Sequence, residues 1–168
     1  MKHTLYKSTN KLKTNLDNSL PTIKIYCDGG CRGNCAQYKN NIGAYAYKLI
    51  YNEHTKLAGK AVQGTTNNQM ELMAVTEALR QLNDKSKNMN IVIYCDSLYV
   101  VNGLTIWWNN WKDRSFNKIK NMEYWKPLKE LYDSFPHIQI YHIKGHSGNV
   151  YNEEVDKYCN YLMDNKIF

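Results

Sequence analysis

The residues IYCD occur twice in this chain, as Ile25-Tyr26-Cys27-Asp28 and as Ile93-Tyr94-Cys95-Asp96. Each copy ends a run of β-branched and aromatic residues, TIKIYCD and NIVIYCD, and such runs are typical of buried strands. Side chains alternate between the faces of a strand, so Tyr and Asp share one face of each copy and Cys lies on the other. If the two strands pair in parallel, we expect both Asp side chains to face one small volume at the carboxyl edge of the sheet.

The remaining sequence predicts a mixed sheet flanked by helices. Alternating or continuous apolar runs predict strands at 22–28, in two arms of a hairpin around Asn52-Glu53-His54, at 90–96 and at 137–143. The Gly-rich segment from Asp28 to about residue 40 is expected to be a loop. Helices are expected from the cap candidates Thr65-Thr66-Asn67-Asn68 to about Leu82, and at 97–111, 122–134 and 150–164. This order predicts an α/β fold with a mixed five-stranded sheet and crossover connections.

The composition indicates one basic globular domain. The chain has 168 residues, of which 43% are hydrophobic and 22% charged, a balance that suits a single folded domain. The formal net charge is +7 and the sequence pI is near 9.1, which favours an anionic partner, although many Lys-rich proteins bind nothing acidic. Residues 1–20 hold four Lys and a single acid, so we expect a basic N-terminal arm before a domain that spans 21–168.

The cysteines indicate a reducing compartment. They are five in number and follow no secretory segment, so we expect free thiols and a cytoplasmic location. Cys27, Cys31 and Cys35 are spaced by four, which leaves a zinc site as an alternative, but the paired CxxC spacing and the downstream His of such sites are missing. No apolar run reaches membrane-spanning length, so we expect no membrane partner, and we expect a monomer.

Two further acids fall on helix faces where apolar residues belong. Glu71 lies on the apolar arc of its predicted helix, in line with Val75 and Leu82. An ionised Glu there is costly without compensation, although stabilisation of the helix N-terminus is the plainer interpretation. Asp156 lies at the margin of the apolar arc of the last helix, near Cys159, where a structural role would be favoured for it alone.

Taken together, these acids predict a metal site. Three or four carboxylates at one sheet edge repel one another, which raises their pKa values. A divalent cation removes that cost, and ligation by oxygen alone selects Mg²⁺ or Mn²⁺ over zinc. Two such ions about 3.5–4 Å apart can activate a water and stabilise the leaving oxygen of a phosphodiester. We therefore interpret the repeated Asp as a metal ligand.

Several linked motifs resemble type 1 ribonuclease H, in the right order from about residue 22 to 164. They are Tyr26-Cys27-Asp28-Gly29-Gly30, Thr65-Thr66-Asn67-Asn68-Gln69-Met70-Glu71-Leu72, Tyr94-Cys95-Asp96-Ser97 and Lys144-Gly145-His146-Ser147-Gly148, with Asp156 ten positions after the His. The resemblance implies the ribonuclease H-like fold and endonucleolytic cutting of the RNA strand of RNA–DNA hybrids, with 5′-phosphate and 3′-hydroxyl products. It implies two Mg²⁺ ions, for which Mn²⁺ is expected to substitute, held by Asp28, Glu71, Asp96 and Asp156.

The resemblance also implies roles around the reacting phosphate and the RNA strand. His146 matches a loop histidine that assists proton transfer or product departure, whereas on its own it would be a plain loop residue. Asn34, Asn67 and Asn68 match positions that approach the minor groove and the RNA 2′-hydroxyls. Without the resemblance, Asn67 and Asn68 would serve equally well as helix caps.

Further positions match contacts to the DNA strand. Thr66 and Asn121 match residues that grip a phosphate, and Trp107 and Trp111 match a channel for the strand. All four Trp lie among Lys and Arg residues between 107 and 126, which suits sugar packing and phosphate neutralisation. The plainer interpretation is that Trp residues belong to the core, and we favour it for the other two, Trp108 and Trp125.

Some positions depart from the family pattern. Cys35 stands where many members have Pro, Phe116 replaces a frequent Trp, and the basic segment between Trp111 and Trp125 is short. We therefore expect weaker hybrid binding, or binding that relies on the N-terminal arm. The alternatives are a catalytically silent hybrid-binding module and a related nuclease or integrase. The complete carboxylate set favours the enzyme, because binding alone has no use for mutually repelling acids.

Overall fold

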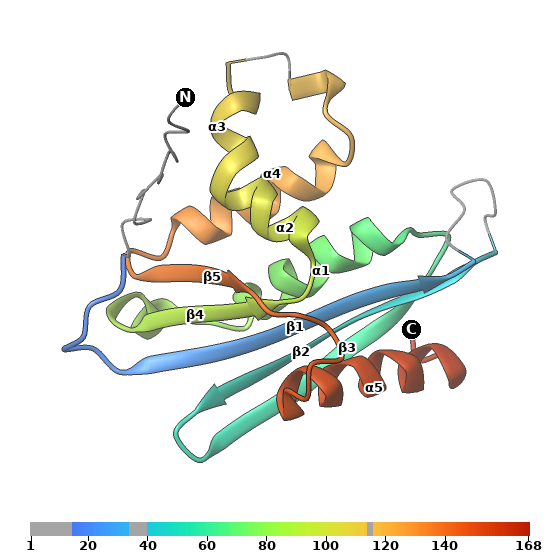
Figure 1. The fold of residues 1–168 in the computed structure, drawn as a ribbon, viewed down its shortest axis with the longest axis horizontal. Helices are drawn as coiled ribbons and strands as arrows, with labels where there is room; N and C mark the ends of the chain where they lie inside the picture. The colour runs from blue at the N-terminus through green and yellow to red at the C-terminus, as the bar shows by residue number, and fades with distance from the viewer. Residues whose placement is uncertain (1–14, 34–39, 114–115) are drawn as a thin grey trace, which may run out of the picture.

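The computed structural model describes residues 15–33, 40–113 and 116–168. Its centre is a five-stranded sheet in the order β3-β2-β1-β4-β5 (Figure 1). The strands are β1 (Thr22–Arg32), β2 (Ile42–Tyr51), β3 (His54–Gln63), β4 (Asn90–Cys95) and β5 (Ile138–His142). The longer helices are α1 (Asn67–Arg80), α4 (Met122–Asp133) and α5 (Val150–Asp164), and the shorter ones are α2 (Leu98–Asn102) and α3 (Trp108–Trp111). The predicted mixed α/β sheet is confirmed.

Helices cover both faces of the sheet. On one face α1, α2 and α4 bury the larger core, which holds Ile25 and Ile93 of the sheet and the fully buried Trp125 of α4. On the other face, α5 packs on β1 and β2 around Tyr26 and Leu162 (Figure 1). The split follows from strand alternation, because successive side chains enter opposite layers.

The two IYCD copies lie side by side. β1 and β4 are parallel, and their register pairs Tyr26 with Tyr94 and Cys27 with Cys95. The two Tyr rings stack with centroids 4.9 Å apart on the α5 face, while both Cys side chains are buried in the core under α1. The condition of parallel pairing is thus met, and the predicted split of Tyr and Cys between the faces is confirmed.

The first strand is longer than the sequence predicted. β1 continues through Asp28 to Arg32, because β2 pairs with it along its whole second half, as far as Arg32 opposite Ile42. Gly29 therefore serves a close approach and not a turn: a Cβ there would lie 2.3 Å from the backbone carbon of Met70 in α1. Residues 34–39, which hold the rest of the predicted loop, lie outside the described residues.

The predicted helix at 97–111 is continuous but irregular. It consists of α2, a π-helical segment at Gly103–Trp107, and α3. A Cβ at Gly103 would lie 1.9 Å from the indole of Trp125, so the backbone at Gly103 lies directly on that ring. The hairpin between β2 and β3 turns at Asn52 as predicted, and α1 ends at Arg80, two residues earlier than expected.

The chain between 15 and 20 is hydrogen-bonded to the sheet. The Asp17 amide donates to Asn90 Oδ1 at 2.8 Å, and the Asn90 amide group donates to the Asp17 carbonyl at 2.6 Å. The His137 ring also contacts the Asn15 carbonyl at 2.9 Å. Of the predicted N-terminal arm, residues 1–14 lie outside the described residues. Among the helices that are described, none is both long and apolar enough to cross a bilayer.

Two adjacent glycines should respond oppositely to the same substitution. Gly29→Ala places a methyl group against the α1 backbone and should lower the free energy of unfolding by about 1–3 kcal/mol. Gly30 has no atom within 4 Å of its Cβ position, so Gly30→Ala should leave stability unchanged or raise it by about 0.5–1 kcal/mol. Urea unfolding of both variants checks this, and equal effects would contradict the close approach of α1 to β1.

Candidate active site

Four carboxylates from four separate elements converge at the carboxyl end of the β1–β4 pair. Asp28 lies on β1, Asp96 follows β4, Glu71 lies on α1, and Asp156 lies on α5. Oxygens of Glu71 and Asp96 and the Cys95 sulfur all lie within 4.8 Å of one another. Asp28 shares a side-chain hydrogen bond with Asp156 and interacts electrostatically with Asp96. The structure thus brings together all four acids that the sequence singled out.

Close packing from both faces produces this convergence. A Cβ at Gly29 would lie 2.4 Å from the Glu71 amide nitrogen, so the first turns of α1 rest on β1 next to Asp28. On the opposite face, the Cys159 thiol of α5 contacts the Asp28 carbonyl at 3.5 Å, one turn after Asp156. The site therefore receives one acid from each covering layer, one from β1 and one from the residue that follows β4.

Burial and mutual repulsion shift the titration of these acids. Burial, followed by repulsion from Asp96, raises the pKa of Asp28 to about 8. Burial, followed by the charges of Asp28 and Asp96, raises the pKa of Glu71 well above its ordinary value. The pKa of Asp96 is also raised, by burial and then by Asp156, although His142 and His146 act in the opposite direction. Within the described residues, the negative charge of this cluster is only partly compensated.

The donor atoms fit a divalent cation. Glu71 Oε2 and Asp96 Oδ1 are buried and have no hydrogen-bond partner among the described residues. Buried carboxylate oxygens without donors are costly unless a cation takes the place of the missing donors. Oxygen ligands of this kind suit Mg²⁺ or Mn²⁺. The neighbouring Cys95 thiol was not singled out as a site residue, because its place in the IYCD repeat reads as an apolar core position.

The loop that carries His146 is attached to the site at both ends. The Ile143 amide donates to the Cys95 carbonyl at 3.0 Å, and Gly145 lies so close that a Cβ there would be 3.2 Å from Asp96 Oδ2. At the far end Asn149 caps α5 and receives a hydrogen bond from the Asn152 amide. His146 itself is exposed and has a positive φ of 54°. The imidazole is close enough to interact electrostatically with Asp96.

His142 is a neighbour of the site that the sequence did not reveal. Its Nε2 lies 3.1 Å from the Asp96 carbonyl oxygen, from the last residue of β5. In the sequence, this His ends an ordinary alternating strand, and only the parallel pairing of Cys95 with His142 brings it next to Asp96.

The Asn residues of α1 are divided between structural and open positions. Thr66 caps α1 by accepting from the Gln69 amide at 3.3 Å, so the cap is the residue before the two Asn. Asn67 Oδ1 accepts a 2.6 Å hydrogen bond from the Cys31 amide and so ties α1 to the end of β1. Asn68 is exposed. Asn34, the third predicted contact to the RNA strand, lies outside the described residues.

A second polar site links α1 to α4. Gln69 Nε2 donates to Asn121 Oδ1 at 3.3 Å, and Asn121 Nδ2 donates to the Tyr99 hydroxyl at 3.2 Å. Asn121 is nearly buried and has a positive φ of 62°, which Asn tolerates better than most residues. Thr66 and Asn121 are thus brought together through Gln69. Gln69 and Tyr99 were not predicted, because nothing in the sequence relates positions so far apart.

The Trp residues form a connected aromatic surface. Trp107 and Trp111 are half-buried, with ring centroids 6.0 Å apart, and Trp111 contacts Trp125 at 5.2 Å. Trp125 is fully buried, as predicted for a core residue. Trp108 is half-buried and packs against the core, with Lys129 5.9 Å from its ring centre. Trp107 and Trp111 therefore present partly open rings next to the Thr66–Asn121 site.

A family model, sequence relatives and solved structures all relate this chain to the same family of proteins. A sequence model of the family described as RNase H matches residues 21–162. The ribonuclease H of Clostridium botulinum is 44% identical over 148 residues, covering 84% of this chain and 95% of the relative. Among solved structures, LC9-RNase H1, a type 1 RNase H with the type 2 active-site motif, superposes with a TM-score of 0.75 at 25% identity, covering 89% of this chain and 75% of that one. LC11-RNase H1 in complex with an RNA/DNA hybrid gives 0.67 at 22% identity, covering 85% and 97%.

Stability without metal should depend on Asp28. Its pKa is about 8 when folded and close to 3.8 when unfolded, so the unfolded chain releases the proton first and stability falls as the pH rises through this interval. Asp28→Asn should therefore raise the free energy of unfolding at pH 8 in EDTA by about 1–3 kcal/mol, with a smaller gain at pH 5. Urea unfolding at both pH values tests this, with the exposed Asp133→Asn as control. A loss of stability at pH 8 would contradict the repulsion.

Proposed function

Because this chain belongs to the type 1 ribonuclease H family, we propose that it is an endonuclease that hydrolyses the RNA strand of RNA–DNA hybrids. The products would carry 5′-phosphate and 3′-hydroxyl ends. The single observation that carries the proposal is the convergence of Asp28, Glu71, Asp96 and Asp156 at one sheet edge, with buried oxygens that lack donors. Without a bound cation, this cluster lowers the stability of the fold, and the described residues show no structural benefit in return.

The four carboxylates are the proposed ligands of two Mg²⁺ ions, for which Mn²⁺ would substitute. When bound, two such ions supply activation of a water and stabilisation of the leaving oxygen. The hydrogen bond between Asp28 and Asp156 requires a proton, and ligation would displace it. Glu71 cannot move away easily, because α1 rests on β1 at Gly29. The chain therefore holds its oxygens in place before any ion arrives.

His146 is the proposed proton carrier of the site. Its loop is attached to the Asp96 side by the Ile143 amide and by the close approach of Gly145, while the imidazole remains exposed. An imidazole can both accept and donate a proton, and this ring is open to solvent. We assign it the transfer of a proton at the cleaved bond or the release of the product.

Two groups of residues are the proposed contacts to the hybrid. On the RNA side, Asn34, Asn67 and Asn68 would contact 2′-hydroxyls, and the bond from the Cys31 amide orients the Asn67 side chain. Amide groups suit this task because they both donate and accept.

On the DNA side, Thr66 and Asn121 would hold a phosphate, and Gln69 fixes their separation. Trp107 and Trp111 would pack against the sugars of the same strand. A hybrid lying across both groups would cross the carboxylate cluster between them. The monomeric state and the reducing, cytoplasmic location predicted from the sequence remain predictions.

Cleavage of a hybrid with separately labelled strands tests the function. The wild-type chain with Mg²⁺ should cut the RNA strand, leave the DNA strand whole and leave an all-DNA duplex uncut. Asp96→Asn should lower kcat at least about 100-fold, because it removes one charged ligand from the cluster. Hybrid affinity without Mg²⁺ should stay within about threefold, since phosphate contacts elsewhere carry it.

The matched control for this substitution is Asp84→Asn, whose side chain is fully exposed at the start of the 3₁₀-helix (Asp84–Asn88) that precedes β4. It should leave kcat unchanged. Hybrid binding by the wild type without cleavage of RNA would support the silent binding module instead. Near-normal turnover by Asp96→Asn would show that Asp96 is not a metal ligand. Cleavage of all-DNA duplex would favour a related nuclease or integrase.

The basic arm should act through salt-dependent binding. The four Lys of the arm all lie in residues 1–14 (Lys2, Lys7, Lys11 and Lys13), whereas 15–20 are bonded to the sheet. Deleting 1–14 should therefore weaken hybrid affinity most at low salt and reduce the slope of log K against log salt by roughly 1–3. Titrations at several salt concentrations measure this slope. If it does not change, the arm makes no contact with the hybrid.

A further inference from the structure

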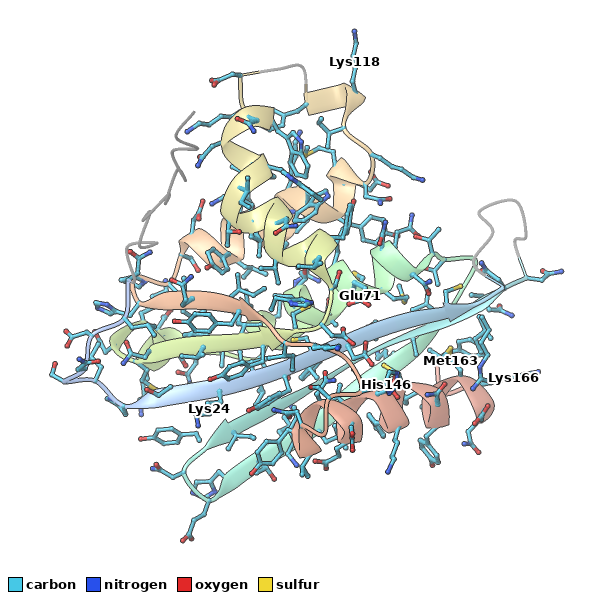
Figure 2. The ribbon with its side chains drawn as sticks, in the orientation of Figure 1. Lys24, Glu71, Lys118, His146, Met163 and Lys166 are labelled. Carbon is cyan, nitrogen blue, oxygen red and sulfur yellow. The ribbon has the colours of Figure 1, made fainter. Side chains whose placement is uncertain are left out.

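A cavity extends from the carboxylate cluster toward the end of β1. It has a volume of about 210 Å³, and Asp28 and Asp156 form part of its wall. From there it runs between the end of β1 and the second half of α5, where Arg32 and Asn160 line it. The cavity is therefore an extension of the proposed reaction site and not an isolated void. Figure 2 places Met163, another lining residue, on the α5 side of this region.

The backbone of β1 leaves this space open. A Cβ at Gly30 would meet no atom within 4 Å, so the absence of a side chain there is not required by packing. Strand alternation places residue 30 on the same face as Asp28 and Arg32. A larger side chain at this position would project into the cavity. Gly30 thus opens a path from Asp28 toward Arg32.

Arg32 is held in place on the cavity wall. Its Nη1 lies 2.5 Å from Asp164 Oδ1, and its Nη2 donates to Asn160 Oδ1 at 3.4 Å. Arg has five N–H donors in a planar fork, so these two contacts leave donors for a third partner. Asn160 is itself oriented, since its amide donates to the Asp156 carbonyl at 3.2 Å.

The ion pair of Arg32 has little value for folding. The side chains of Arg32 and Asp164 are 45% and 60% exposed, and pairs this open contribute about 0–1 kcal/mol to stability. A guanidinium fork next to a polar cavity is, however, well suited to bidentate recognition of a phosphate. A phosphate would meet a fork that is already oriented, which lowers the entropy cost of binding.

The ligand follows from the position of the cavity. A phosphodiester held at Asp28 and Asp156 belongs to a strand with a further phosphate one nucleotide away on each side. A neighbouring phosphate therefore lies to one side of the carboxylate cluster. On the side of the cavity, Arg32 is the Arg among the lining residues. We propose that this cavity binds the RNA-strand phosphate next to the scissile one, with Arg32 as the contacting residue, which rests on the function proposed above.

The experiment compares Arg32→Ala with a matched control. Arg80→Ala removes the same charge from another exposed ion pair, with Glu77 at the end of α1. On a hybrid with a short ribonucleotide tract that limits the cut site, Arg32→Ala should raise KM about fivefold to tenfold relative to Arg80→Ala, with kcat within about twofold. Equal KM values for the two variants would overturn the proposal. If the wild type itself cuts no hybrid, the proposed function is wrong. That outcome is distinct from equal KM values, which would contradict only the role of Arg32.

Two further measurements test whether Arg32 itself contacts the phosphate. Asp164→Asn keeps the Arg and removes only its partner, so KM should stay within about twofold of wild type. A rise as large as that of Arg32→Ala would show that the ion pair carries the effect, against the proposal.

The phosphate itself is tested with substrates that carry a neutral methylphosphonate on either side of the scissile phosphate. At one of these two positions the KM penalty of Arg32→Ala should shrink to less than about twofold, because the charge it binds is already gone. A full KM penalty at both positions would overturn the proposal. If the penalty instead disappears when the methylphosphonate is in the DNA strand, Arg32 contacts the DNA strand and the proposal is wrong.

Discussion

Mutual repulsion among buried carboxylates is the constraint around which this molecule is arranged. Asp28, Glu71 and Asp96 all have raised pKa values because burial and neighbouring negative charge disfavour their ionised forms. Such a cluster persists only because the surrounding packing gives the acids no alternative position. The resulting cost is largest without cations and is removed by them, which links the stability of the fold to the chemistry of the site.

Close backbone packing provides that confinement. At Gly29 the first turns of α1 lie against β1 at a separation that no side chain would permit, and this brings Glu71 to the carboxyl edge of the sheet. α5 approaches the same strand from the other face, where the Cys159 thiol meets the Asp28 carbonyl. The loop with His146 is then fixed by a bond from Ile143 to the end of β4. The acids of α1 and α5 are thus attached to β1, and the His146 loop is attached to the neighbouring strand β4.

The surfaces on either side of the cluster differ in chemistry. Toward α4, the Thr66–Gln69–Asn121 bonds and the rings of Trp107 and Trp111 form a polar and aromatic surface in a segment that carries Lys residues. Toward the end of β1, the surface is polar and charged, with Asn67 bonded to Cys31 and with Arg32 oriented by Asp164. This division would suit the proposed hybrid substrate, because the sugars and phosphates of its two unlike strands would meet different partners.

The sequence by itself determined the two IYCD strands, the candidate acids and the order of helices and strands, because alternation and helical periodicity are local properties that survive in the linear chain. The parallel pairing of the two copies was a condition that only the tertiary structure met. Tertiary structure alone decided that β1 runs on to Arg32, that Gly29 serves a close approach, and that Gln69 bonds to Asn121. It also brought His142 to the Asp96 carbonyl. These features depend on how separate elements dock against one another, and no local pattern encodes the contact between residues far apart in the chain.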